Sequence, residues 1–324
     1  MTHAIRIHET GGPEVLRWEQ VDVPAPGKGE VRVRHTAIGL NFIDTYYRTG
    51  LYALPVPLPT SIGSEAAGVV QAIGEGVSGL EVGDRVAYAT GPVGAYTEER
   101  NVGAEFLVKL PPKVDDQVAA AAMLKGLTAH YLLEMTTTFN AVSSAKVLVH
   151  AAAGGVGQLL VQWLKHRGAF VIGTVGSEEK AALARELGCN EVINYRHEDV
   201  VARVQKIGRV DVVYDSIGKD TFHASLDCLR PRGLMVTFGQ SSGAIGPIDP
   251  RLLAQKGSLF MTRPVLGDYA KGVELHARAR ELFEAIASGV LKVKVAQTYP
   301  LRDAERAHRD LEGRKTTGSS LLIP

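Results

Sequence analysis

A short glycine-rich segment constrains the fold of this chain more than any other feature. Residues 151–157 read Ala-Ala-Ala-Gly-Gly-Val-Gly and lie between an apolar run and a stretch with helical periodicity. Ala152, Gly154 and Gly157 match the three small positions of a dinucleotide-binding turn, which bends sharply, admits a pyrophosphate and lets helix pack on strand. The amide groups at the helix start would face the phosphates. Alone, this pattern is weak, because a strand–helix turn that binds nothing has the same residues.

The context of the turn strengthens the prediction. Strands are expected at 146–150, 170–175, 191–194, 210–215 and 233–238, with helices at 158–167, 177–187, 198–207 and 221–229. Strands that alternate with helices imply right-handed crossovers and a parallel sheet. This part of the chain is therefore expected to be α/β, a Rossmann doubly wound parallel-sheet nucleotide domain.

The first 120 or so residues have a different texture, with β-rich runs separated by glycine and proline turns. Strands are expected at 4–8, 15–19, 30–39, 66–73 and 85–89, and helix begins only at the acidic residues 115–117, which lead into 118–124. Near the end, helices are expected at 272–289 and 303–312 and a strand at 321–323. Pattern alone does not assign this tail to either part of the chain.

Composition excludes several classes of protein. Apolar residues make up 45% and charged residues 22%, and 36 basic against 35 acidic residues give a net charge of +1. This balance gives no reason to expect nucleic acid or an anionic membrane as partner. No apolar run approaches the roughly 18 residues of a membrane span, so a cytoplasmic location is expected. The two cysteines, Cys189 and Cys228, are expected to be small buried apolar residues.

The end of the second expected strand indicates which dinucleotide binds. Enzymes for the unphosphorylated cofactor place a carboxylate there, to accept from the ribose 2′-hydroxyl. Here Gly173 and Gly176 leave room, Ser177 can donate a hydrogen bond, and Lys180 brings positive charge. These groups suit a 2′-phosphate and predict NADPH. The two glutamates at 178 and 179 oppose this interpretation unless they point to solvent. The alternative to a phosphate-binding role for Lys180 is that it is a solvated surface lysine.

With these residues in view, the chain resembles a known family. The turn at 151–157, the segments 26–34 and 39–44, and further segments at 63–68, 83–86, 125–129, 214–216, 256–259 and 314–324 are similar to the medium-chain dehydrogenase/reductase superfamily. Within it, the chain resembles the zinc-free NADPH:quinone oxidoreductases related to zeta-crystallin, essentially from end to end.

The resemblance implies two domains and a cofactor site. A β-rich GroES-like catalytic domain would comprise 1–125 and 265–324, the Rossmann NADPH-binding domain would comprise 126–264, and the cofactor would run along the cleft between them. A 2′-phosphate clamp would consist of Ser177, Lys180, Tyr195 and Arg314. With the glycine turn, the other nucleotide contacts are expected at Asn41, Phe42, Tyr46, Tyr131, Gly154, Gly155, Val156, Gly173, Gly176, Ser216, Phe238, Gly239, Gln240, Ser241, Thr262 and Arg263.

Zinc alcohol dehydrogenases of the same superfamily are the main rival. Their ligand cysteine falls where Asn41 stands, their ligand histidine is replaced by Ser64, and no cysteine lies between residues 88 and 109. Tetrahedral zinc would lack its ligands, so no metal site is expected. A quinone accepts a hydride without Lewis-acid help, whereas alcohol oxidation needs assisted alkoxide formation.

Asn41, Asp44, Tyr46 and Tyr52 are the candidate catalytic residues, with Tyr52 and Asn41 favoured for polarising the substrate. The alternative is that the tyrosines only support the nicotinamide or the loop. Besides quinone reduction, two functions stay open: NADPH-dependent reduction of an enone or alkenal C=C bond, and an NADPH-binding protein that contacts RNA. The apolar run 258–262, expected at a sheet edge, predicts a homodimer formed through sheet edges.

Overall fold

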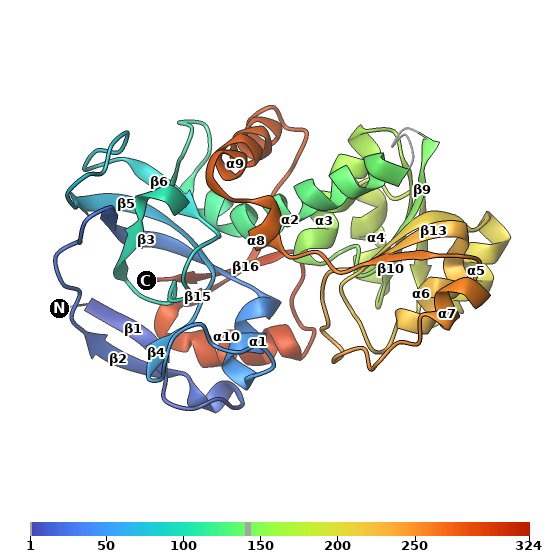
Figure 1. Cartoon of the computed structure of the whole chain (residues 1–324), viewed down its shortest axis with the longest axis horizontal. Coiled ribbons are helices and arrows are strands. Elements are labelled where there is room, and N and C mark those ends of the chain that lie inside the picture. The colour runs from blue at the N-terminus through green and yellow to red at the C-terminus, as the bar shows by residue number, and fades with distance from the viewer. Residues whose placement is uncertain (1, 140–143) are drawn as a thin grey trace. The chain divides into compact units, whose positions relative to one another are not determined.

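The computed structural model describes residues 2–139 and 144–324, and the chain forms two compact units (Figure 1). Unit 1 comprises Met1–Leu127 and Ala270–Pro324, and unit 2 comprises Thr128–Tyr269. The C-terminal tail, which pattern alone did not assign, therefore belongs to the unit formed by the first part of the chain.

Unit 1 is built on two sheets. The larger has the order β15-β16-β3-β5-β6-β8, with β7 also paired to β3, and the smaller has the order β2-β1-β4. The strands are β1 (Thr2–Ile7), β2 (Arg17–Val21), β3 (Glu30–Leu40), β4 (Thr60–Ser61), β5 (Glu65–Ile73), β6 (Arg85–Tyr88), β7 (Glu99–Gly103), β8 (Val108–Lys109), β15 (Val295–Pro300) and β16 (Ser319–Ile323). Strand β16 pairs antiparallel with β3, with Leu321 opposite Gly39. The C-terminal strand thus joins the sheet that is built mainly by the first part of the chain.

Unit 1 also contains the α-helices α1 (Phe42–Thr49), α9 (Gly272–Ala287) and α10 (Ala304–Glu312) and the first part of α2 (Asp116–Phe139). Apolar side chains from the β-strands and from α10 form one buried cluster, which includes Ile5, Val33, Ile38, Tyr96 and Ala307. Burial of this apolar surface holds the strands of the two sheets together. The helix α1 follows β3 directly, so its first residues stand at the end of a rigid strand.

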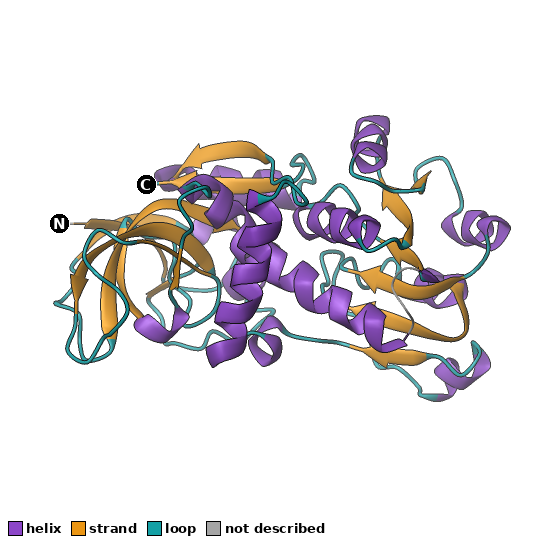
Figure 2. Cartoon of the chain, turned by 90° about the horizontal axis from the view of Figure 1, so that it is seen from above, coloured by secondary structure: helices purple, strands orange, loops and turns teal. Residues whose placement is uncertain are grey.

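Unit 2 contains a six-stranded sheet of order β11-β10-β9-β12-β13-β14, in which every pairing is parallel. The strands are β9 (Lys146–Val149), β10 (Phe170–Val175), β11 (Glu191–Asn194), β12 (Val210–Asp215), β13 (Leu229–Thr237) and β14 (Phe260–Thr262), and the helices between them are α3 (Gly155–His166), α4 (Glu178–Glu186), α5 (Val200–Ile207), α6 (Phe222–Cys228) and α7 (Arg251–Gln255). Figure 2 shows helices on both sides of these strands. The expected α/β Rossmann fold with a β-rich GroES-like part is confirmed.

The main departure from the sequence analysis is α2, which spans Asp116–Phe139 rather than 118–124. Nearly every residue from Ala119 to Leu133 is buried. A helix that is buried all round has no polar face, and so the 3.6-residue period that reveals a surface helix is missing. Helix α1 was not predicted either, because no helix was expected before residues 115–117. The short helices α7 and α8 (Leu266–Tyr269) and the strands β4, β7, β8 and β15 were likewise not predicted.

The expectations about the cysteines and about membrane-spanning segments can be compared with the structure. Cys189 and Cys228 are both buried free thiols, as expected, and burial raises the pKa of each to about 12. Such thiols stay protonated and unreactive at neutral pH. None of the described helices combines the length and the apolarity that crossing a lipid bilayer requires.

Candidate functional site

The predicted nucleotide residues of unit 2 gather at one edge of its sheet. Because all six strands are parallel, their carboxyl ends lie on the same side, where doubly wound sheets bind ligands. The predicted residues that follow or end these strands are Gly154, Gly155 and Val156 after β9, Gly173, Gly176, Ser177 and Lys180 at β10, Tyr195 after β11, Ser216 after β12, Phe238, Gly239, Gln240 and Ser241 after β13, and Thr262 and Arg263 at β14. The order also reverses direction between β9 and β12, which is the switch point of this fold.

The glycine turn after β9 has the geometry that close approach of a phosphate needs. Gly154 N–H donates to the carbonyl oxygen of Ala151 at 2.8 Å, and a Cβ at Gly157 would lie 2.3 Å from that same oxygen. Helix α3 starts at Gly155, three residues earlier than predicted, and its first 5→1 hydrogen bond runs from Gln158 N–H to Gly154 O at 2.9 Å. The amides of the first turn therefore have no partner within the helix and fit an anion.

The end of β10 is open where an NAD-binding enzyme would have a carboxylate. A Cβ at Gly176 would lie 2.4 Å from the Tyr195 hydroxyl oxygen, so only glycine lets this half-exposed ring lie across the strand end. The Ser177 hydroxyl accepts from the Lys180 backbone N–H at 3.3 Å and caps α4. Ser177, Lys180 and Tyr195 are thereby brought to one place.

Glu178, which opposed the NADPH prediction, has a specific partner. Its Oε1 accepts a hydrogen bond from Asn194 Nδ2 at 2.6 Å. The residue itself is exposed, as is Glu179. Glu179 is thus exposed as the NADPH prediction requires, whereas the Glu178 carboxylate is held at the end of β11 by Asn194.

The loops after β12 and β13 are locked together. A Cβ at Gly239 would lie 2.6 Å from Ser216 O, and the Ser241 N–H donates to that carbonyl at 3.2 Å. Arg263 Nη1 donates to Thr237 O at 3.2 Å and lies 3.4 Å from Gly239 O. These contacts join three of the predicted segments into one surface.

Tyr131 lies elsewhere in unit 2, on α2. It is buried, and its ring stacks on Tyr269 with the ring centroids 4.8 Å apart and the planes 20° apart. This packing holds the Tyr131 ring against Tyr269, the last residue of unit 2. Its predicted contact with the cofactor stays a prediction.

In unit 1 the predicted catalytic residues come from α1 and the turn after it. Asn41 caps the helix, and its backbone N–H donates to Asp44 Oδ2 at 2.9 Å. Tyr46 and Tyr52 pack against one another with ring centroids 5.1 Å apart, and Tyr52 N–H donates to Tyr46 O at 3.0 Å. All four residues are therefore held by one short segment, and Phe42 is the first residue of its helix.

Asp44 is the electrostatic centre of this group. Its side chain is fully buried, and its carboxylate accepts from the Ser64 hydroxyl at 2.7 Å and the Tyr96 hydroxyl at 3.1 Å as well as from Asn41 N–H. Burial raises the pKa of the Asp44 carboxyl to about 7, and nearby Glu65 adds to the rise, although the three donors oppose it. A carboxyl with this pKa can hold or release a proton near neutral pH.

The Asn41 side chain is oriented by a buried ion pair. Its Nδ2 donates to Glu65 Oε1 at 2.8 Å, and Lys125 Nζ donates to the same oxygen at 2.7 Å. The other oxygen, Oε2, accepts from the Leu124 N–H at 2.6 Å. A Cβ at Gly39 would lie 2.2 Å from Glu65 Oε1, so this arrangement requires glycine in β3. Asn41 is thus a fixed group, with its amide turned toward Glu65.

Behind Asp44 the hydrogen bonds continue to α10. The Tyr96 hydroxyl lies 3.0 Å from His308 Nε2, and Arg48 Nη1 lies 3.0 Å from His308 Nδ1. Arg48 also binds Glu312 through two parallel hydrogen bonds of 2.9 and 2.8 Å. Burial lowers the pKa of His308 to about 3, and the charge of Arg48 adds to the effect. Burial, with Asp44 next, holds the pKa of Tyr96 well above its usual range.

Ser64, Tyr96 and His308 belong to this network but were not predicted from the sequence. Ser64 was noted only as the residue that replaces a histidine ligand. It is partly exposed, and its hydroxyl donates to Asp44. No sequence signal joins Asp44 to Tyr96, which are 52 residues apart, or Tyr96 to His308, which are 212 apart. Only the fold brings these residues together.

Arg314, the remaining clamp residue, lies in unit 1 just after α10. Its backbone has a φ of 58°, in the left-handed region that a non-glycine residue adopts rarely. Its N–H donates to Leu311 O at 3.1 Å, which closes the helix end. The turn therefore gives Arg314 a defined backbone position, and its predicted contact with a 2′-phosphate stays a prediction.

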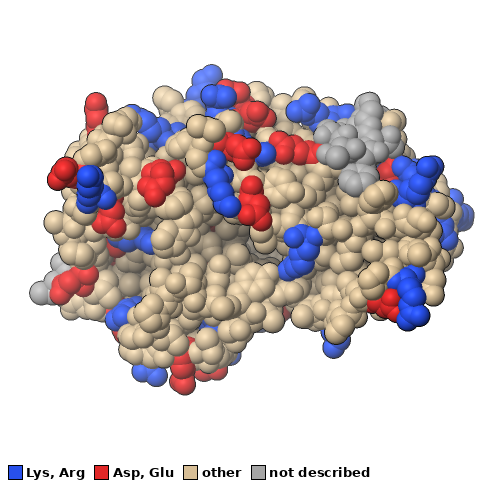
Figure 3. Space-filling model, in the orientation of Figure 1, with Lys and Arg blue, Asp and Glu red and all other residues tan. Residues whose placement is uncertain are grey.

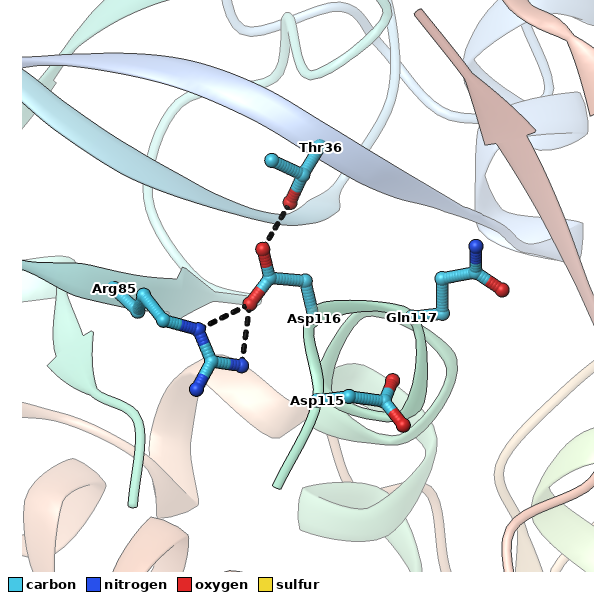
Figure 4. A pocket seen from close by; sticks show the side chains of 5 residues that line it. All are labelled: Thr36, Arg85, Asp115, Asp116 and Gln117. Atoms are coloured by element: carbon cyan, nitrogen blue, oxygen red, sulfur yellow. Dashed lines mark hydrogen bonds and ion pairs between the residues drawn. The ribbon is translucent and has the colours of Figure 1, made fainter. Parts of the chain in front are cut away.

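A pocket elsewhere in unit 1 is lined by Thr36, Arg85, Asp115, Asp116 and Gln117 (Figure 4). Asp116 Oδ2 accepts from the Thr36 hydroxyl at 2.6 Å, and Asp116 Oδ1 accepts from Arg85 Nε at 2.8 Å. Asp115 caps α2 by accepting from Val118 N–H at 2.8 Å. These bonds fasten the start of α2 to β3 and β6 and indicate a structural role.

Among residues 2–139 and 144–324, no group of three His, Cys, Asp or Glu side chains is placed to hold a metal ion. At the positions where zinc dehydrogenases have ligands, Ser64 and Asn41 hydrogen-bond to Asp44 and Glu65 instead. Neither a hydroxyl nor an amide nitrogen belongs to the usual zinc donor set.

Comparison with known proteins places the chain in a family. Residues 27–112 match the alcohol dehydrogenase GroES-like domain, and residues 155–276 match the zinc-binding dehydrogenase domain. The chain is 51% identical to a quinone oxidoreductase of Pseudomonas aeruginosa, with 100% of both chains covered. It belongs to the quinone oxidoreductase family of medium-chain dehydrogenases/reductases.

Two further relatives of this quinone oxidoreductase family member are informative. The crystal structure of Escherichia coli quinone oxidoreductase complexed with NADPH is 50% identical, covers 100% of both chains and superposes with a TM-score of 0.96. A 2-haloacrylate reductase from a Burkholderia species is 48% identical over 100% of this chain and 99% of its own. The family thus includes proteins named for two different acceptors.

Proposed function

We propose that this protein reduces quinones with NADPH by hydride transfer without a metal. The observation that carries the proposal is the end of β10, where Gly176 opens the strand end to Tyr195, Ser177 and Lys180, in a chain half identical over its whole length to quinone oxidoreductases. A site with donors and a cation and without a carboxylate favours a 2′-phosphate.

The residues of unit 2 fit the cofactor. NADPH supplies the hydride, and the protein binds and orients it. The first-turn amides of α3 and the close approach at Gly154 and Gly157 suit the pyrophosphate. Ser177, Lys180, Tyr195 and Arg314 would hold the 2′-phosphate. Tyr131, Ser216, Arg263 and residues 238–241 would line the rest of the cofactor.

Unit 1 would supply the groups near the acceptor. Asn41, Asp44, Tyr46 and Tyr52 lie on α1 and its following turn, and the paired tyrosine rings suit a flat ring. The Asn41 amide donates to Glu65, so we assign Asn41 mainly to positioning. We place residues 1–125 and 265–324 in the catalytic domain and residues 126–264 in the NADPH-binding domain.

A second candidate is reduction of an activated C=C bond. The similarity to a protein named 2-haloacrylate reductase favours it. The experiment follows NADPH oxidation with a quinone, an alkenal and a haloacrylate at equal concentration, and the reverse reaction with a primary alcohol and NADP⁺. We expect the quinone to react fastest and a chelator to leave the rate unchanged. Activity confined to alcohols, or lost with a chelator and restored by zinc, would contradict the proposal.

A homodimer and a cytoplasmic location complete the proposal. Strand β14 lies at the edge of the six-stranded sheet, and its residue Phe260 is half-exposed. An apolar edge strand of this kind favours pairing with a second copy, and sedimentation at the mass of a single chain would reject it. The two cysteines are free thiols, as is usual in a reducing compartment.

Nucleic acid is not among the proposed partners. The net charge is +1, and on the face in Figure 3 basic and acidic residues are interspersed. Binding to RNA depends on a basic surface with aromatic stacking groups. A salt-dependent gel shift with RNA would overturn this expectation.

A further inference from the structure

Among the described residues that contact the Asp44 carboxylate, Ser64 is the one residue that is partly exposed. Asp44, Tyr96 and His308 behind it are fully buried. We propose that Ser64 donates a proton to the reduced substrate and that Asp44 returns a proton to Ser64. This inference rests on the proposed function. Ser64 is then a further catalytic residue, and Asp44 acts through it.

The direction of the hydrogen bonds follows from the chemistry of the groups. A guanidinium only donates, so His308 Nδ1, which lies 3.0 Å from Arg48 Nη1, is the acceptor. The proton of the neutral imidazole then lies on Nε2 and is donated to the Tyr96 oxygen. The Tyr96 hydroxyl in turn donates to Asp44 Oδ2. Arg48 thus fixes the donor-to-acceptor direction of every hydrogen bond from His308 to Asp44.

This direction leaves one oxygen of Asp44 to serve Ser64. Oδ2 accepts from both Asn41 N–H and the Tyr96 hydroxyl, whereas Oδ1 faces the Ser64 hydroxyl at 2.7 Å. A proton on Oδ1 would be donated to Ser64 Oγ, and the serine hydroxyl would turn its own hydrogen outward. The two arrangements differ by one proton on Asp44 Oδ1 and by a rotation of the Ser64 hydroxyl about its C–O bond.

The electrostatic surroundings of Asp44 suit this exchange. The titratable groups that act on its carboxyl are Glu65 of β5, Tyr47 of α1 and Tyr96. Arg48 of α1 acts on Tyr96, and His308 of α10 lies between Arg48 and Tyr96. Lys125 of α2 pairs with Glu65 rather than with Asp44. Burial raises the pKa of Asp44 to about 7, so the carboxyl carries its proton in a large share of molecules at neutral pH.

The reaction balances with one proton. A quinone gains a hydride, and hence two electrons, and becomes a hydroquinone monoanion. The O–H bond of Ser64 breaks, its proton forms a new O–H bond on that anion, and the Asp44 proton moves to Ser64 Oγ. After the product leaves, the Asp44 carboxylate regains a proton from solvent through the hydroxyl of Ser64, which is a partly exposed residue. The sum is quinone, NADPH and one proton giving hydroquinone and NADP⁺.

The test compares the pH dependence of kcat for the wild type and three variants, Ser64→Ala, Asp44→Asn and Tyr96→Phe, with saturating NADPH. In the wild type, kcat should fall above about pH 7, because Asp44 loses its proton. Asp44→Asn should lower kcat about 100-fold and abolish this fall of kcat at high pH, the alkaline limb of the pH profile. Tyr96→Phe removes a donor that stabilises the carboxylate and should move the limb to higher pH.

Two quinones sharpen the test. A halogenated quinone gives a weakly basic product that needs little protonation, whereas a methylated quinone gives a more basic one. Ser64→Ala should lower the rate with the methylated quinone about 100-fold and with the halogenated quinone much less. Because this variant loses one oxygen at the partly exposed end of the network, it tests the proposal even if Asp44→Asn fails to fold.

Tyr88→Phe is the matched control. It also removes a buried tyrosine hydroxyl that lies 3.0 Å from a histidine nitrogen, that of His35, outside the Asp44 network. It should leave the pH profile unchanged. An unchanged limb in Asp44→Asn, or equal losses with both quinones in Ser64→Ala, would overturn the inference while leaving the proposed function intact. A wild type that does not oxidise NADPH with any quinone would overturn the proposed function and this inference with it.

Discussion

Two fully buried aspartates, one in each unit, show how differently the two halves of this protein are built. Asp215 of unit 2 accepts from the N–H groups of Ile217 and Gly218 and from the hydroxyls of Thr221 and Ser225, all within ten residues. Asp44 of unit 1 instead reaches Ser64 and Tyr96, which lie 20 and 52 residues away. The first network closes a local turn, whereas the second joins distant segments into a site.

The Asp215 network also fixes the edge where the nucleotide is proposed to bind. Ser225 lies 3.0 Å from His150 Nε2, and His150 Nδ1 lies 3.0 Å from the Thr174 hydroxyl. These bonds join α6 to the ends of β9 and β10. The proposed nucleotide site is thus formed by backbone groups and small residues that are close in the sequence. The proposed proton-transfer site is formed by side chains that only tertiary packing brings together.

The largest expected effect falls on the side-chain network of unit 1. Arg48→Met removes a buried guanidinium that binds Glu312, His308 and the Gly11 carbonyl. Loss of one partner of such a buried pair should lower the free energy of unfolding by about 4 kcal/mol, as measured by urea denaturation. Arg251→Met, which breaks an exposed pair with Asp249, should change it by less than about 0.5 kcal/mol. Equal effects would refute the assigned role of burial.

The next effect falls on the backbone-built site of unit 2. A Cβ at Gly157 would lie 2.3 Å from Ala151 O, and Gly157→Val should therefore cost about 3 kcal/mol. If this energy is lost from binding, NADPH affinity falls about 100-fold in a fluorescence titration. Gly246→Val adds a side chain where no atom lies within 4 Å and should bind normally. Unchanged binding in Gly157→Val would separate the turn from the nucleotide.

The pH dependence of stability isolates Asp44. Its pKa is about 7 in the fold and 3.8 in the unfolded chain, so between these values the unfolded chain binds fewer protons. The free energy of unfolding of the wild type therefore loses about 1 kcal/mol per pH unit from this group as pH rises. Asparagine does not titrate, so the stability of Asp44→Asn relative to the wild type should increase across this window. Urea unfolding between pH 4 and about 8 measures the difference.

Three buried histidines act in the opposite direction, and their contribution must be removed by comparison. Burial lowers the pKa of His308 to about 3 and that of His35 to about 4, and it also lowers the pKa of His150. Each therefore contributes stability that increases as pH rises toward 6.5. They are present in both the wild type and Asp44→Asn. Only the difference between the two proteins therefore reports on Asp44, and a difference independent of pH would contradict the raised pKa.

The smallest effect concerns the clamp around the 2′-phosphate. Lys180→Ala and Arg314→Ala should each weaken NADPH binding about tenfold, which is about 1.4 kcal/mol, and leave NADH binding unchanged. Lys206→Ala removes an exposed lysine near the end of α5 in the same unit and serves as the control. If both clamp variants keep the wild-type preference, the assignment of Lys180 and Arg314 is wrong.

What the sequence revealed follows the same division between the units. The Rossmann strands and helices were predictable because each has its own periodicity, and because the glycines of the turn at 151–157 contact residues close to them in the sequence. Ser177, Lys180 and Tyr195 follow strand ends that could be counted along the chain. In contrast, α2 was predicted as a short helix because it lacks a polar face, and Tyr96 and His308 were missed because only tertiary packing brings them to Asp44.

The most direct test of the account is a titration of the wild-type protein with NADPH and with NADH under identical conditions. The open strand end at Gly176, with Ser177, Lys180 and Tyr195 around it, predicts that NADPH binds at least about tenfold more tightly. Equal binding of the two nucleotides, or tighter binding of NADH, would contradict it.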